Sequence, residues 1–156
     1  MEVKTEAIVD QSQESFGVQW TQLEKIKSLL PSSQVEAVGA LAVPMIGRPE
    51  IDLMVISKRV VDDSDILVKN GYKQGPIVDG VSFFKMVVGG FEVAVQIIPL
   101  GHKMIAIHRN IIALLQRDGE LRKRYEEFKR TLSGLSREEY KREKGGWIDK
   151  NIKPLL

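Results

Sequence analysis

The sequence predicts an α+β fold in which a mixed β-sheet is followed by a helical tail over residues 103–153. Three observations support this prediction: apolar residues recur at helical spacing near the N-terminus, short β-rich segments follow between residues 34 and 98, and helical spacing returns after Pro99. With 156 residues, of which 43% are hydrophobic and 28% charged, the chain has the composition of one soluble domain, 1–156. Residues 1–17 are polar and are expected to form an N-terminal extension.

The first half of the chain is predicted to alternate helix and strand. Apolar residues at spacings of three and four predict a helix over residues 18–30 that ends before Pro31. The pattern then predicts, in order, a strand at 34–38, a turn with a short helical segment at 40–46, a strand at 50–57 and a helix at 60–70. Residues 62–64 are expected to cap this last helix, and Asn70-Gly71 to end it.

A β-hairpin is predicted near the middle of the chain. Residues 82–88 and 91–98 flank Gly89-Gly90, and two glycines allow the positive φ angles of a tight turn. Further along, three apolar stripes at helical spacing predict three helices. The breaks between these helices are expected at Asp118-Gly119 and Ser133-Gly134. Ser136 and Glu139 have the spacing of a capping box at the start of the third helix.

Composition excludes several kinds of site and partner. The chain contains no cysteine, which excludes disulfides and thiolate chemistry, and only 2 histidines, so any metal is expected to be oxygen-bound. No apolar run reaches the roughly eighteen residues of a membrane span, and we expect a cytoplasmic protein without a membrane partner. The net charge is only +2, and the basic segment after Gln116 has the charge spacing of a solvated helix, which makes nucleic acid an unfavoured partner.

Residues 38–56 are the segment most informative about function. Gly39 follows the strand at 34–38, and backbone amides beside a residue without a Cβ can hold a phosphate closely. Glu50 and Asp52 share one face of the next strand, where two carboxylates can bind a magnesium ion that also takes phosphate oxygens. This pattern is compatible with metal-assisted phosphoryl transfer. The spacing alone favours the alternative, in which both acids face the solvent.

A longer pattern surrounds these residues. Ala37 to Ile46 and Arg48 to Leu53 carry Gly39, Val43, Pro44, Pro49, Ile51 and Asp52 at the positions of the pattern H-I-G-S-T-S-V-P-G-L followed by K-P-I-I-D-I. Further similar positions are Gly71-Tyr72, Arg109-Asn110, Tyr125, Lys129, Leu132, Tyr140 and Lys144. From about Trp20 to Ile152 the chain resembles the GrpB family, a branch of the nucleotidyltransferase superfamily. The resemblance implies a nucleotidyltransferase-like mixed sheet with packed helices.

The resemblance also implies roles for individual residues. Gly39 and Ala40 correspond to a turn that holds a nucleoside triphosphate, and Asp52 corresponds to a carboxylate that binds Mg²⁺, with Glu50 beside it. The chain departs from the family pattern at four polar positions, which here are Ala37, Ala40, Leu41 and Asn110. Losing one hydroxyl bond to a charged phosphate costs about 1.5–3 kcal/mol, or roughly ten- to hundredfold in binding. Several such losses together favour a member that binds a ligand without turnover.

A third acid is expected from a later strand, because nucleotidyltransferases generally use one to activate the attacking hydroxyl or to complete metal coordination. Glu92 is the only acid between residues 91 and 98, and alternation places it on the same side as Ala94 and Gln96. We infer this catalytic role from alternation, since the resemblance does not imply it. A solvent-facing Glu92 is equally compatible with the sequence.

Three basic residues are further candidates for binding phosphate. Arg109 follows the last strand, where its guanidinium can hold a phosphate in bidentate fashion or pair with a carboxylate instead. Lys129 and Lys144 occupy helical positions that can face the same cleft. Lysines on helices are usually exposed, so we expect both of these at the surface.

The sequence leaves functions from different classes open. The first is a Mg²⁺-dependent nucleotidyltransferase, in which a nucleoside triphosphate lies on the Gly39 turn and an unidentified acceptor hydroxyl attacks its α-phosphorus. The second is a catalytically degenerate nucleotide- or anion-binding regulatory domain of the same fold, which the replaced polar residues favour. Nucleic-acid binding through the basic tail ranks last, because the chain shows no recognition motif. The nucleotide, the acceptor and the oligomeric state do not follow from the sequence.

Overall fold

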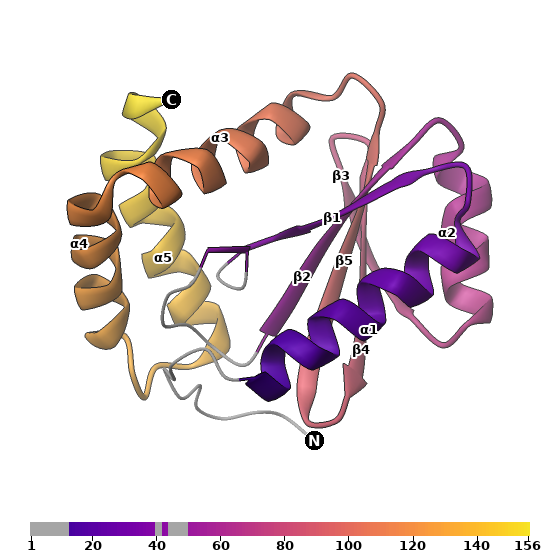
Figure 1. Ribbon diagram of the computed structural model, residues 1–156, viewed down its shortest axis with the longest axis horizontal. Helices are drawn as coiled ribbons and strands as arrows, with labels where there is room; N and C mark the ends of the chain where they lie inside the picture. The colour runs from indigo at the N-terminus through magenta and orange to yellow at the C-terminus, as the bar shows by residue number, and fades with distance from the viewer. Residues whose placement is uncertain (1–12, 40–41, 44–49) are drawn as a thin grey trace.

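The computed structural model describes residues 13–39, 42–43 and 50–156 (Figure 1). The strands are β1 (Gln34–Val38), β2 (Glu50–Ser57), β3 (Lys73–Val78), β4 (Val81–Val88) and β5 (Phe91–Pro99). The helices are α1 (Gln13–Leu29), α2 (Val60–Lys69), α3 (Lys103–Arg117), α4 (Gly119–Arg130), α5 (Arg137–Asn151) and the short 3₁₀ helix η2 (Lys153–Leu155). Ala40, Leu41 and most of the turn predicted at 40–46 lie outside the described residues.

The strands form one mixed sheet in the order β1-β2-β5-β4-β3. β2 and β5 run parallel, whereas the other neighbouring pairs are antiparallel. The hairpin predicted around Gly89-Gly90 is the β4–β5 pair, and both glycines have positive φ angles. The predicted α+β class with a mixed sheet and a helical C-terminal part is therefore confirmed.

The first face of the sheet packs against α1 and α2, which lie on the same side of it (Figure 1). Alternate residues of the central strands form this core: Ile51, Leu53, Val55, Val93, Val95 and Ile97. They contact Ile26 and Leu30 near the end of α1 and Leu67 of α2. Because strand side chains alternate between faces, Glu50 and Asp52 of β2 and Glu92 and Gln96 of β5 point to the opposite, second face.

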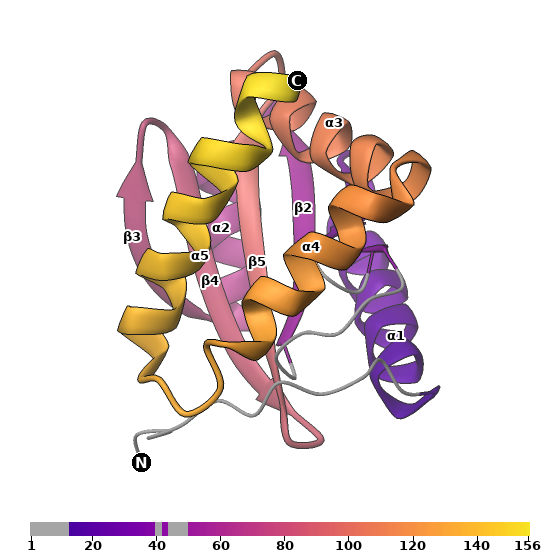
Figure 2. The same ribbon diagram turned by 90° about the vertical axis from the view of Figure 1, so that its left-hand side faces the viewer.

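The second face is covered by α3 and the C-terminal helices (Figure 2). Ile105 of α3 packs on Met54 and Ile98 of the sheet. The ring of Trp147 in α5 stacks on two rings of α4, with centroids 5.0 Å from Tyr125 and 5.5 Å from Phe128. This stacking fixes α5 against α4, so the predicted tail forms a wall facing the second face of the sheet.

Three details differ from the sequence-based prediction. Helix α1 begins at Gln13, inside the stretch predicted as an extension. The prediction missed this start because the first turn is polar and carries no apolar stripe. Strand β3 was not predicted, since all its residues are exposed and Gly75 and Pro76 interrupt any alternation. Helix α2 has Arg59 at its N-cap without a side-chain hydrogen bond, so the predicted cap at residues 62–64 is wrong.

Asp63, expected to cap α2, is buried and ties three elements together instead. Its Oδ2 accepts hydrogen bonds from the hydroxyls of Ser33, before β1, and Ser57, at the end of β2, both at 2.6 Å. We expect Asp63→Ala to lower the free energy of unfolding by about 2–4 kcal/mol, because two hydrogen bonds to a charged acceptor are lost. Urea unfolding measures this loss, with the exposed Asp65→Ala on the same helix as control. Equal stability of the two variants would contradict it.

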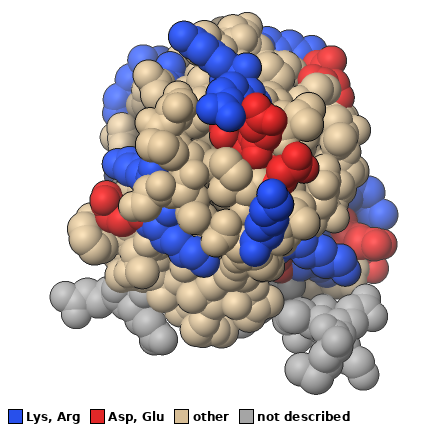
Figure 3. Space-filling view, turned by 90° about the vertical axis from the view of Figure 1, so that its right-hand side faces the viewer, with Lys and Arg blue, Asp and Glu red and all other residues tan. Residues whose placement is uncertain are grey.

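The surface at the right of Figure 1, shown in Figure 3, carries Lys and Arg side chains interspersed with Asp and Glu. Such mixing is typical of a solvated surface and gives no single-sign patch for a nucleic acid on this face. None of the helices in the described ranges is both long and apolar enough to cross a membrane.

Candidate functional site

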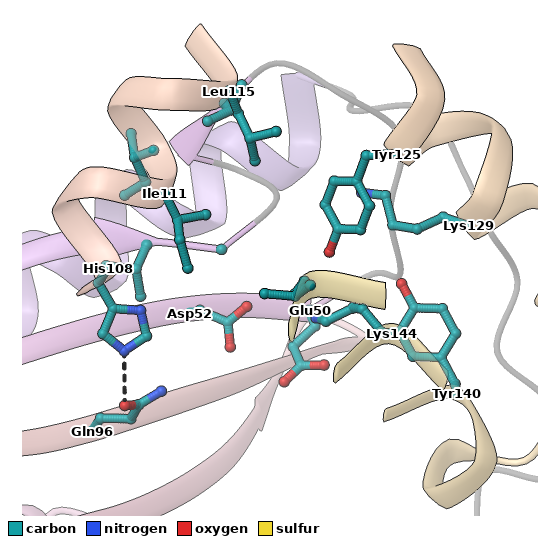
Figure 4. A pocket seen from close by; sticks show the side chains of 15 residues that line it. Glu50, Asp52, Gln96, His108, Ile111, Leu115, Tyr125, Lys129, Tyr140 and Lys144 are labelled. Carbon is teal, nitrogen blue, oxygen red and sulfur yellow. Dashed lines mark hydrogen bonds between the residues drawn. The ribbon is translucent and has the colours of Figure 1, made fainter. Parts of the chain in front are cut away.

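A pocket lies between the second face of the sheet and helices α3, α4 and α5, with a cavity volume of about 240 Å³ (Figure 4). The polar side chains that line it include those of Glu50, Asp52, Gln96, His108, Lys129 and Lys144. Its apolar wall includes Ile111, Ile112, Leu115 and Ile148. The pocket thus joins carboxylates from the sheet and amines from the tail beside an apolar surface, an arrangement suited to a ligand with an anionic group.

Gly39 lies against Asp52 at one edge of this pocket. Val38 is the register partner of Asp52 across β1 and β2, which brings the residue after β1 beside the Asp52 carboxylate. Gly39 has a φ of +74°, and a Cβ placed there would overlap Asp52 Oδ2 and lie 3.0 Å from its Cγ. The structure therefore brings the predicted glycine turn and the predicted carboxylate together on the same side of the sheet.

Glu50 and Asp52 form an acidic pair on the second face, as their spacing predicts. Burial, together with the charge of Glu50 and a hydrogen bond with it, raises the pKa of Asp52 to about 7, although the nearby charge of Lys144 opposes the shift. Near neutral pH the two side chains therefore favour sharing a proton. A bound cation would favour the state in which both are ionised, because it offsets their repulsion.

Lys129 and Lys144 were expected at the surface, and this expectation is wrong, because both line the pocket. Lys129 is 1% exposed, and its Nζ lies 4.5 Å from the ring centroid of Tyr125. Burial, and secondarily the charge of Lys144, lowers the pKa of Lys129 to about 7. Lys144 Nζ lies 5.7 Å from the ring centroid of Tyr140. The sequence contains a signal for the buried side of both helices, since each lysine lies four residues after a buried tyrosine and therefore on the same helix face.

The depressed pKa of Lys129 predicts a pH-dependent stability. Between about pH 7, where the folded protein loses this proton, and the ordinary lysine pKa of 10.5, the unfolded chain holds more protons, so the free energy of unfolding rises with pH. We expect Lys129→Met to remove this rise and to increase the free energy of unfolding at pH 6.5, by on the order of 1–3 kcal/mol. Urea unfolding at pH 6.5 and 9 measures both effects. A pH-dependent rise of the same size in Lys129→Met would contradict the assignment.

Glu92 is on the predicted side of β5 but is not among the described residues that line the pocket. It is the register partner of Glu50, and thus shares its face. Its carboxylate is bound by Lys85 Nζ at 2.9 Å and by the guanidinium of Arg137. Glu92 therefore joins α5 to the sheet through Arg137 and β5 to β4 through Lys85, and this geometry gives no support to its predicted catalytic role.

Arg109 also lies apart from the described pocket lining. Its guanidinium forms a bidentate pair with Glu36 of β1, with Nε 3.0 Å from Oε1. This is the carboxylate-paired alternative that the sequence left open. In α3 the pocket is lined by His108, Ile111, Ile112 and Leu115, at spacings of three, four and seven, and Arg109 lies off this stripe. The side chains of His108 and Gln96 are members of the site that the sequence analysis did not identify.

The carboxylates of the pocket fit a Mg²⁺ ion that the protein binds together with a ligand. The described residues contain no cluster of three or more His, Asp or Glu side chains that could hold a metal alone. Mg²⁺ is usually held by one or two carboxylates together with waters and the phosphates of a substrate. Glu50 and Asp52 supply two such carboxylates, so they fit an ion shared with a phosphorylated ligand.

The fold, a mixed sheet that carries Gly39 and the carboxylate pair on one face, is similar to the nucleotidyltransferase-like folds. The sequence matches the family described as GrpB protein over residues 7–153, and the chain belongs to this family. A crystal structure of the conserved protein GrpB from Enterococcus faecalis is similar with a TM-score of 0.73 and 15% identity, covering 92% of this chain and 98% of that one. No curated protein matches the chain.

Two further solved structures share the fold at low identity. The structure of Cid1 in complex with the UTP analog UMPNPP has a TM-score of 0.52 and 17% identity, covering 79% of this chain and 42% of that one. The structure of the GLD-2/RNP-8 complex has a TM-score of 0.55 and 15% identity, covering 78% of this chain and 54% of that one. The chain thus spans about half the length of these two proteins, or less, and the likeness to them is one of fold.

Proposed function

We propose that this protein is a Mg²⁺-dependent nucleotidyltransferase that transfers a nucleotidyl group from a nucleoside triphosphate to an acceptor hydroxyl. The observation that carries the proposal is the contact between Gly39 and Asp52 at the edge of a pocket that also holds Lys129 and Lys144. Carboxylates that bind a cation and amines that bind phosphate are the two halves of a triphosphate site. The likeness in fold to Cid1, whose structure contains a UTP analog, supports this ligand class.

Each half of the pocket has a distinct task in this proposal. Glu50 and Asp52 would hold Mg²⁺, which when bound neutralises phosphate charge and orients the triphosphate. Lys129 and Lys144 would bind phosphate oxygens from the opposite wall, where burial strengthens each charge interaction. The acceptor oxygen forms a bond to the α-phosphorus while the bond to the bridging oxygen breaks, and pyrophosphate leaves with that electron pair.

Isothermal titration of the four nucleoside triphosphates, with Mg²⁺ and with EDTA, tests the binding step. We expect Mg²⁺ to tighten binding of at least one of them by tenfold or more, since it removes the repulsion between phosphates and carboxylates. Lys144→Gln should weaken this binding about ten- to hundredfold by removing one charged hydrogen bond. Arg109→Gln should change the nucleotide affinity by less than about threefold, because Arg109 pairs with Glu36 and does not line the pocket. Nucleotide binding that is unchanged by Mg²⁺ and unchanged in Lys144→Gln would contradict the proposal.

A second candidate function is a binding or regulatory domain that holds the nucleotide without turnover. It is favoured by the commitment of Glu92 to Lys85 and Arg137, which leaves the described pocket with two carboxylates. The polar family positions replaced in this chain point the same way. A pyrophosphate-release assay separates the candidates, because Mg²⁺-dependent binding without pyrophosphate release would identify the regulatory form.

A further inference from the structure

Transfer to a hydroxyl needs a group that accepts the hydroxyl proton, and the acids near the pocket are committed to other partners. Glu50 and Asp52 hydrogen-bond to each other, where they would hold the cation. Glu92 is bound by two cations. On β5 the register partner of Asp52 is Ala94, which carries no polar group, and the next residue on the same face is Gln96. On this face of β5, Gln96 is therefore the polar residue beside which a proton acceptor can lie.

His108 of α3 lies directly beside Gln96 and lines the same pocket as Asp52 (Figure 4). Its Nε2 is 3.2 Å from Gln96 Oε1. Because an amide oxygen only accepts hydrogen bonds, this contact places the imidazole hydrogen on Nε2 and leaves the lone pair on Nδ1. Gln96 thus fixes both the tautomer and the orientation of a neutral base in the pocket.

We propose that His108, held by Gln96, is the group that accepts the proton of the attacking hydroxyl. The inference rests on the function proposed above. As the acceptor oxygen bonds to the α-phosphorus, its proton passes to Nδ1 of His108, and pyrophosphate takes the electrons of the broken bond. The resulting imidazolium keeps its Nε2 hydrogen bond to Gln96 and afterwards releases the Nδ1 proton to water.

The surroundings of His108 keep it in the form that this role needs. Burial lowers the pKa of His108, so the imidazole is neutral at pH 7. The charged groups that face it across the pocket are Glu50 and Asp52 of β2, Lys129 of α4 and Lys144 of α5, while β5 contributes the neutral Gln96. Activity should therefore rise with pH through the pKa of His108, below its ordinary value of 6.5, and then level off.

The test measures pyrophosphate release at saturating nucleotide and Mg²⁺, with water as the acceptor, together with nucleotide affinity by calorimetry. His108→Gln should lower kcat by about 10²- to 10⁴-fold, as expected for loss of a general base, and change the affinity by less than about threefold. Gln96→Glu should shift the acid limb of the pH profile upward, because a carboxylate stabilises the imidazolium. Arg117→Gln, at an exposed position of α3 outside the pocket lining, is the control and should leave kcat and the profile unchanged.

The outcomes separate this inference from the proposed function. If the wild type binds no nucleotide in a Mg²⁺-dependent way, the proposed function fails, and this inference with it. If the wild type binds nucleotide but releases no pyrophosphate, the base role is overturned and the regulatory candidate stands. If the wild type turns over and His108→Gln keeps its kcat, or Gln96→Glu leaves the acid limb in place, only the inference about His108 is overturned.

Discussion

Asp52→Asn is expected to lower Mg²⁺-dependent pyrophosphate release by at least about 10²- to 10³-fold, the size typical of losing one stabilising group in an active site. The amide is isosteric with the carboxylate but has no charge to hold Mg²⁺, so the phosphates lose their alignment. Nucleotide binding should also lose its dependence on Mg²⁺. Asp65→Asn, at an exposed position of α2, is the control and should have no effect. Undiminished turnover in Asp52→Asn would exclude the proposed chemistry at this site.

The same variant should be more stable than the wild type at alkaline pH. The folded protein raises the pKa of Asp52 from 3.8 to about 7, so the folded state holds this proton more tightly than the unfolded state. Its contribution to stability is therefore full below about pH 3.8 and is lost as the pH rises through about 7. Relative to the wild type, Asp52→Asn should gain on the order of 2–4 kcal/mol between pH 4 and 8.5. Urea unfolding at both pH values measures the gain.

A loss of activity combined with a gain in stability would mark Asp52 as a functional rather than a structural acid. Two carboxylates held together destabilise the folded state, and such strain is found where a ligand relieves it. A variant that loses stability at pH 8.5 would instead indicate that the pair supports the fold. The measurement thus distinguishes a cation site from a buried structural pair.

The central strands and their polar face could be predicted from sequence because both depend on local patterns. The alternation around Ile51 and Leu53 defines β2 and also places Glu50 and Asp52 on one face. The place of Gly39 in the site was predictable because this residue, which has no Cβ, follows the strand that precedes the acidic pair. Strand β3 was missed since its pairing with β4, and not its own residues, makes it a strand.

The cationic wall could not be predicted in the same way, because it depends on how α4 and α5 pack across the sheet. The spacing after Tyr125 and Tyr140 marks the helix faces that carry Lys129 and Lys144, but whether these faces meet the sheet depends on how α4 and α5 pack. Trp147, which stacks on Tyr125, is part of that packing. The partners of Arg109 and Glu92 are likewise remote in sequence: Glu36 for the first, Arg137 for the second. Contacts of this kind follow from tertiary structure, so composition and spacing left them open.

Gly39→Ala is expected to damage the site more than the fold. Two costs arise at this position: an alanine at a φ of +74° is strained by about 1–2 kcal/mol, and its Cβ would overlap Asp52 Oδ2. Gly101→Ala is a matched control, since Gly101 has a φ of +85° but no atom within 4 Å of the added Cβ. Both variants should lose similar backbone stability in urea unfolding. Only Gly39→Ala should weaken Mg²⁺-dependent nucleotide binding, by about ten- to hundredfold, because the carboxylate must move.

The double variant Gly39→Ala/Asp52→Asn decides whether the two residues act through their contact. If the alanine weakens binding by displacing the carboxylate, it can do little further harm once that carboxylate has lost its charge, and the two effects will not add. Additive losses in the cycle would mean that Gly39 acts on the phosphates by itself, through its backbone amide. The single variants also test the site directly. If Gly39→Ala binds nucleotide as tightly as Gly101→Ala, the ligand lies elsewhere in the molecule.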